Sequence, residues 1–419
     1  MRNQFPLGKR PPVPVAPAVD SLTQAALGAV VGELVLGRQL GRRAIAWGVL
    51  FGTLPDLDVV FDWILPTAWG LVMHRGISHS LLLIGLLTWL LAKPLAKRWE
   101  DGKKAGKKKP AKGKGKKAAK ETVSVTPQRA ACFVFLAWGT HVLIDVFTVY
   151  GTGVLDPLPV PRLSTDNISI IDPLVTIPLV VAVIIGLFVK PEEWKIGKGI
   201  RSASWCLGIS AFYVFLSFLA KLSISRAVDS DMAKRGVSWQ RKMEAPTIGN
   251  IVLWRAVVDR PGEFWIGYRS VFDPAGQAIR WTVVPKHEEI AAKHADAREV
   301  KIVKWFSKGW WIARESADGV WLADMRFAEM RSWDDKGIAL RPVFAWTYQP
   351  EKSSDRLRRH KVGADEQDQI ESRRERLTRD GKEMLRRMGR RISGEDAAWE
   401  GKERLIGPVL ALQEYLESR

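Results

Sequence analysis

Six long apolar segments occupy the first half of this 419-residue chain, and they constrain its fold more than any other feature. They cover roughly residues 22–37, 44–64, 76–94, 130–150, 168–189 and 202–224. A membrane-spanning helix needs about 20 mainly apolar residues, and the last two segments reach that length with one charged residue each. The first three are shorter or contain acids, which suits short, tilted or re-entrant helices. The sequence therefore predicts a mostly α-helical polytopic membrane domain, residues 20–225, with about five or six hydrophobic helices.

The flanking regions have a different composition. Residues 1–19 are Pro-rich and predict a disordered N-terminal arm. From about residue 250, short runs of aromatic and β-branched residues are separated by turn signals such as 259–262 and 273–276. They predict a small antiparallel β-rich domain outside the membrane, residues 226–349, whose tryptophans lie in its core. Residues 350–419 predict a charged helical tail that packs on the protein or on a partner.

The formal net charge of +19 is regional. Residues 93–120 contain 13 Lys and Arg but only two acids, Glu100 and Asp101. The stretch KKAGKKKPAKGKGKK has no bulky apolar residue and predicts a disordered linker, residues 95–125. We expect it to attract anionic lipid heads. It lacks interleaved aromatic residues or a nucleic-acid-binding module, so no specific nucleic-acid partner is expected, and the sequence identifies no protein partner.

Lys and Arg also predict the orientation in the membrane. If all six segments span, three basic loops fall on one side: 38–43, the 95–125 linker and 190–201. The excess of Lys and Arg marks this side as cytoplasmic. The N-terminal arm and the domain after residue 224 would then lie outside, in the periplasm or extracellular space. The two cysteines, Cys132 and Cys206, lie inside apolar segments, which excludes a disulfide-built secreted domain.

Ionisable residues inside apolar segments are costly, so each is a functional candidate. The candidates are Asp20, Glu33, Asp56, Asp58, Asp62, His74, His79, His141, Asp145 and Asp172. Under the predicted orientation, most of them lie near the outer ends of four or five segments. Glu33 is the exception, since it lies toward the cytoplasmic end, where Arg38 or Arg42 could neutralise it, and Asp62 falls in an outer loop.

Spacing within three segments supports metal binding. His141 and Asp145 are four residues apart and therefore share a helical face. Pro55 interrupts the second segment just before Asp56 and Asp58, as expected where a membrane helix lines a polar cavity.

The stretch from His74 to His79 contains Gly76 and Ser78, which predict a turn in which Ser78 caps the next helix and both rings face one site. Imidazoles and carboxylates suit a divalent metal, zinc first and manganese or iron as alternatives. The competing interpretation is a set of structural polar contacts, with carboxylates paired to Arg75 or Arg38.

Five stretches resemble one family. They are residues 20–24, GTLPDLD (52–58), HRGISHS (74–80), HVLIDVFTVYGT (141–152) and IDPLVTIPL (171–179). They resemble the YdjM-like family, described as LexA-regulated inner-membrane metal-dependent hydrolases, and the Trp-rich downstream region resembles that of longer members. The resemblance implies a bacterial inner-membrane location. It also implies a metal or catalytic set of Asp56, Asp58, His74, His79, His141 and Asp145. Many members have Thr-His where this chain has Thr23-Gln24, so one imidazole is missing, and Asp20, Gln24 or Asp172 would supply additional ligands or support.

The leading hypothesis is an integral-membrane metal-dependent hydrolase that acts near the outer membrane face on a phosphodiester or ester of a small or lipid-like molecule. Asp58 or Asp145 would act as general base and Arg75 would hold a phosphate. Two other functions fit the same residues. One is a metal or proton transporter, which predicts acids continuing across the bilayer. The other is a membrane-anchored binding or assembly protein, in which the outer domain binds the partner.

Overall fold

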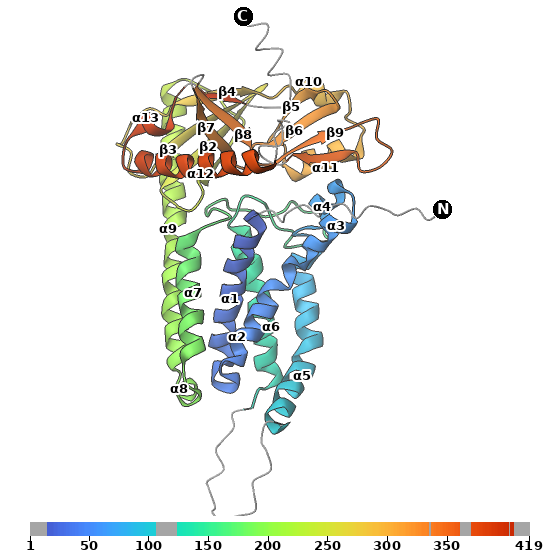
Figure 1. Cartoon of the computed structure of the whole chain (residues 1–419), viewed down its shortest axis with the longest axis vertical. Coiled ribbons are helices and arrows are strands. Elements are labelled where there is room, and N and C mark those ends of the chain that lie inside the picture. The colour runs from blue at the N-terminus through green and yellow to red at the C-terminus, as the bar shows by residue number, and fades with distance from the viewer. Residues whose placement is uncertain (1–14, 106–123, 335–336, 361–369, 402, 406–419) are drawn as a thin grey trace, which may run out of the picture.

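A helical bundle and a β-rich domain are stacked along the long axis of the molecule (Figure 1). The computed structural model describes residues 15–105, 124–334, 337–360, 370–401 and 403–405. The long helices of the bundle are α1 (Val15–Leu40), α2 (Arg43–Thr53), α5 (Leu81–Ala105), α6 (Pro127–Val146), α7 (Pro173–Phe188) and α9 (Lys198–Lys234). Short elements join them: the 3₁₀ helices η1 (Pro55–Val60) and η2 (Ile77–His79), and the helices α3 (Phe61–Ile64), α4 (Thr67–Met73) and α8 (Pro191–Lys195).

Between two and four membrane spans fit the described helices. By length and apolar composition, α6 and α9 could each cross a membrane. Two further spans arise if each of two bent pairs counts as one: α2 with Pro55–Ile64, bent by 45°, and Thr67–His79 with Leu81–Glu100, bent by 50°. Helix α7 is apolar but only 16 residues long. The predicted count of five or six is therefore not confirmed: two segments bend at the motifs that contain Pro55 and Gly76, and even with each bent pair counted as one span the described helices give at most four.

Helices α1 and α2 pack with almost no side chain between them. A Cβ atom on Gly28 would lie 2.3 Å from the Gly48 carbonyl oxygen, and one on Gly32 would lie 2.2 Å from that of Ala44. The pair Gly28 and Gly32 therefore allows the close helix approach expected for small residues four apart. This contact holds α2 against α1, and α2 leads directly into η1.

The second half forms the predicted antiparallel β-rich domain. Strands β1 (Arg241–Pro246), β2 (Leu253–Arg260), β3 (Glu263–Ser270) and β4 (Trp281–Pro285) pair in sequence order. A second sheet has the order β10-β9-β6-β5, from Leu357–His360, Ala345–Tyr348, Gly319–Asp324 and Trp311–Ser316. In the third, β8 (Gly337–Pro342) lies between β7 (Glu329–Asp334) and the parallel β11 (Glu403–Leu405). The helices of this domain are α10 (Glu288–Ala292), α11 (Arg298–Phe306), α12 (Ile370–Ile392) and α13 (Asp396–Trp399).

Several predicted boundaries differ from the structure. Strands β10 and β11 lie beyond residue 349, where only charged helices were predicted, because their short polar sequences carry no alternating apolar pattern. Helix α9 continues through residue 225 to Lys234. Helix α5 extends to Ala105, so the beginning of the predicted linker is helical, whereas residues 106–123 lie outside the described part. The same holds for residues 1–14 of the predicted arm and for 406–419 of the predicted tail.

The two halves share a hydrophobic core. Ala68 and Leu71 of α4, with Val149 and Tyr150 of the loop after α6, belong to the same buried cluster as the aromatic residues of the β-rich domain. Four parts of the bundle lie at its opposite end (Figure 1). They are the connection from α1 to α2, helix α8, the C-terminal end of α5 and the N-terminal end of α6. The two basic loops that the structure describes in full, 38–43 and 190–201, therefore end the bundle on one side and the β-rich domain covers the other.

Candidate metal centre

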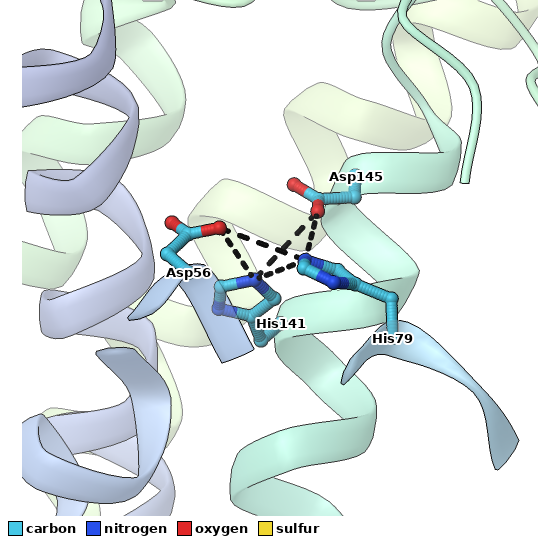
Figure 2. A group of neighbouring side chains, drawn as sticks. All are labelled: Asp56, His79, His141 and Asp145. Carbon is cyan, nitrogen blue, oxygen red and sulfur yellow. Dashed lines mark hydrogen bonds and ion pairs between the residues drawn. The ribbon is translucent and has the colours of Figure 1, made fainter. Parts of the chain in front are cut away.

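Four side chains from three elements meet in the half of the bundle nearer the β-rich domain. Asp56 follows Pro55 in η1, where the missing proline N–H interrupts the helix that α2 began. His79 ends η2, and His141 and Asp145 lie one turn apart on α6. Figure 2 shows the four side chains pointing toward one another.

The potential ligand atoms are close together. The Nε2 atoms of His79 and His141 lie 3.1 Å apart. Oδ2 of Asp145 lies 3.1 Å from the first of these nitrogens and 3.6 Å from the second. Oδ1 of Asp56 lies 3.6 Å and 3.4 Å from the same two atoms. All four atoms lie within 4.8 Å of one another. Neighbouring ligand atoms of a tetrahedral site with bonds of about 2.0–2.1 Å are about 3.3 Å apart, so these distances match a single ion.

The hydrogen bonds around the group leave the ligand atoms free to bind a cation. A carbonyl oxygen only accepts, so Nδ1 of His141 donates to the Gly52 oxygen at 2.7 Å. The neutral ring then carries its lone pair on Nε2, which faces the group. Oδ1 of Asp56 and Oδ2 of Asp145 are buried and accept no hydrogen bond from the described residues. Buried carboxylate oxygens without donors are costly, and a cation between them removes that cost.

Asp56 marks the open side of the group. The side chains of His79, His141 and Asp145 are fully buried, whereas that of Asp56 is 17% exposed. Among the four side chains, that of Asp56 is therefore the least enclosed.

Asp58 and His74 were also predicted as ligands, but they lie outside the group of four. Asp58 accepts hydrogen bonds from Nδ1 of His74 at 2.7 Å, from the Arg75 backbone N–H at 2.9 Å and from the Ser78 hydroxyl at 2.5 Å. Ser78 also lies 2.9 Å from Nδ1 of His79, which it orients. The prediction that Ser78 caps the next helix was wrong. Instead, the Ser80 hydroxyl accepts the Leu82 N–H at the start of α5.

Arg75 lies behind the group rather than at its opening. Its backbone adopts a left-handed φ of 56°, which turns the chain between His74 and His79 around Asp58. Its guanidinium is buried, donates to the Thr148 hydroxyl at 2.9 Å and lies 3.3 Å from Oδ1 of Asp145. This placement suits orientation of Asp145 better than the predicted contact with a substrate phosphate.

The three predicted supporting residues have different positions. Gln24 donates to Oδ1 of Asp145 at 2.9 Å and is fully buried, so it supports the group. Asp172 caps α7 by accepting the Leu174 N–H at 3.1 Å, and it accepts the Tyr213 hydroxyl at 3.2 Å, without contact to the group. Asp20 lies in α1, and its side chain is outside the described part.

Glu33 is fully buried, away from the metal group. Its carboxylate packs against Gly186, where Oε1 would lie 2.5 Å from an added Cβ atom, and neither oxygen has a hydrogen-bond partner among the described residues. The expected pairing with Arg38 or Arg42 is therefore not found. Sequence reasoning missed the Gly52 carbonyl, which accepts from His141, and Tyr150, whose ring centre lies 5.1 Å from that of His74. A backbone oxygen leaves no signal in a sequence, and Tyr150 is one of many aromatic residues.

Comparison with known proteins identifies one family. No curated protein and no solved structure matches this chain. The family model described as YdjM inner membrane protein matches residues 19–224, which contain all four residues of the metal group and their hydrogen-bond partners. Over residues 19–224, this chain therefore matches the YdjM family of inner membrane proteins.

Proposed function

We propose that this protein is a membrane-embedded, metal-dependent hydrolase. The observation that carries the proposal is the group of Asp56, His79, His141 and Asp145, in which two imidazole nitrogens and two carboxylate oxygens without hydrogen-bond donors face one point. Two nitrogen and two oxygen ligands at tetrahedral distances favour zinc over manganese or iron. A divalent ion held there would lower the pKa of water and polarise a phosphoryl or acyl oxygen.

The surrounding residues divide the remaining tasks. Asp145 is held from behind by Arg75 and Gln24, and Asp58 already accepts three hydrogen bonds, so neither carboxylate is well placed to take another proton. Asp56 lies on the open side, and its second oxygen points away from the group (Figure 2). We therefore assign proton transfer from the attacking water to Asp56 rather than to Asp58 or Asp145.

The apolar surface beside Asp56 supports a lipid-like substrate. Leu57, Trp63 and Ile64 follow it in η1 and α3, and their exposed fractions are 60%, 74% and 66%. Tryptophan is enriched at membrane–water interfaces, so this short segment suits the boundary between acyl chains and headgroups. A phosphodiester or ester bond of an amphiphile lying at this depth would be next to the open side of the group.

Metal content tests the proposal directly. The full chain purified in detergent should contain about one ion, as a single four-ligand site requires. His141→Ala should lose it while keeping its helical content and elution volume, and His294→Ala, a histidine of the β-rich domain, should retain it. Metal-loaded protein would then be assayed with chromogenic phosphodiesters and esters and with lipids in mixed micelles. Absence of metal after reconstitution would overturn the metal site and favour the binding or assembly protein, whereas loaded protein inactive on every substrate class would overturn the hydrolase alone.

A further inference from the structure

We propose that the β-rich domain holds the metal group in shape through Tyr150, which acts as a positioning residue. This inference rests on the proposed metal site and adds a task for the half of the chain that the family model does not cover. Tyr150 follows α6 by four residues and is buried where the bundle meets the β-rich domain.

One side of Tyr150 contacts residues that hold the metal group. Its ring centre lies 5.1 Å from that of His74, edge to face, and 5.0 Å from the guanidinium carbon of Arg75. His74 hydrogen-bonds Asp58, and Arg75 pairs with Asp145. The ring is therefore one contact away from two carboxylates that orient or form the group.

The other side of Tyr150 is enclosed by the β-rich domain. The rings of Phe306, Phe327 and Phe344 lie 5.0, 6.1 and 6.3 Å from it. Such edge-to-face aromatic pairs stabilise a contact beyond the burial of the rings. Burial raises the pKa of Tyr150 to about 12, so the phenol is neutral at physiological pH and the contacts depend on its ring rather than on a charge.

Polar contacts fix the same junction. Arg326 donates to the backbone oxygens of Val149 and Tyr150, both at 3.3 Å, while Asp324 holds its guanidinium at 2.7 Å. A second segment of the bundle is held in the same way. Asp355 accepts the Thr67 backbone N–H at 2.9 Å at the start of α4, the helix that leads into His74. Both segments that frame the metal group are thus tied to the β-rich domain. Substitutions that remove these contacts should lower metal affinity, as expected for residues that orient ligands.

The test compares ring contacts on the two sides of the junction. Tyr150→Leu and Phe306→Leu remove contacts from opposite sides, Tyr150→Phe restores the ring, and Phe264→Leu removes an equally buried aromatic ring that stacks on Trp310 within the domain. Zn²⁺ affinity of each full-length variant would be measured by chelator competition, and ligand geometry by the visible absorption of the Co²⁺-loaded protein.

We expect Tyr150→Leu and Phe306→Leu to weaken Zn²⁺ binding about 10- to 100-fold and to change the Co²⁺ spectrum, whereas Tyr150→Phe and Phe264→Leu match the wild type. Equal effects of Phe306→Leu and Phe264→Leu, or wild-type binding in both leucine variants at the junction, would overturn the positioning role and leave the proposed function intact. A wild-type protein that binds neither ion would instead overturn the metal site itself.

Discussion

At the scale of single residues, Asp58 shows how a carboxylate can serve the site without belonging to the group of four. It accepts three hydrogen bonds from the turn that contains His74, Arg75 and Ser78. Replacing Asp58 with Asn removes the charge and one acceptor, so the turn and the His79 ring lose their fixed position. We expect Asp58→Asn to weaken metal binding about 10- to 100-fold. Asp172→Asn, which alters a predicted supporting residue that lies elsewhere, should leave the affinity unchanged in the same titration. Equal losses in both variants would show that the effect is general destabilisation.

Glu33 is a second residue whose surroundings make a prediction. A carboxyl group that is buried without a hydrogen-bond partner costs about 1–3 kcal/mol. Glu33→Met keeps a straight side chain beside Gly186 and removes both oxygens, so we expect a higher melting temperature in detergent and unchanged metal content. Glu33→Gln keeps two polar atoms and should gain less. A destabilised Glu33→Met protein with normal expression would show that this carboxyl has a favourable partner and would revive the transporter hypothesis.

At the scale of elements, the contact between α1 and α2 links packing to the site. A Cβ atom on Gly48 would lie 2.2 Å from the Gly28 carbonyl oxygen, which forces the two backbones apart. Overpacking of this kind costs about 1–3 kcal/mol, and it would move the end of α2, where the Gly52 oxygen holds His141.

We therefore expect Gly48→Ala to lower both the melting temperature and the metal occupancy. Gly85→Ala in α5, where a Cβ atom meets nothing within 4 Å, is the matched control and should change neither. Normal occupancy in a destabilised Gly48→Ala protein would separate the packing of α2 from the site.

The sequence predicted the elements of the site better than the roles within it. The cost of placing ionisable groups in apolar segments identified all four residues of the group, and the four-residue spacing of His141 and Asp145 placed them on one face. The sequence could not show which of the two acids, Asp56 or Asp58, belongs to the group of four. Which of two acids faces the group depends on the turn that η1 makes after Pro55, and local propensity does not determine that turn.

At the scale of the whole molecule, the antiparallel domain was predicted because its strands carry aromatic and β-branched residues. The docking of this domain on the bundle was not predicted, because the contacts of Tyr150 join residues that are more than 150 positions apart. The same long-range packing explains why the strands continue beyond residue 349, since β10 pairs with β9 and β11 pairs with β8.

The arrangement of the whole molecule also predicts its orientation in the membrane. The basic loops 38–43 and 190–201 end the bundle opposite the β-rich domain (Figure 1), and such loops favour the cytoplasmic side. In a background in which Cys132 and Cys206 are replaced by Ala, two exposed positions report the two ends: Ser393→Cys in the β-rich domain and Lys195→Cys in α8. A membrane-impermeant maleimide should label Ser393→Cys in right-side-out vesicles and Lys195→Cys in inside-out vesicles. The reverse pattern would place the metal group on the cytoplasmic side, and labelling of both positions in the same vesicles would contradict a bundle that spans the membrane.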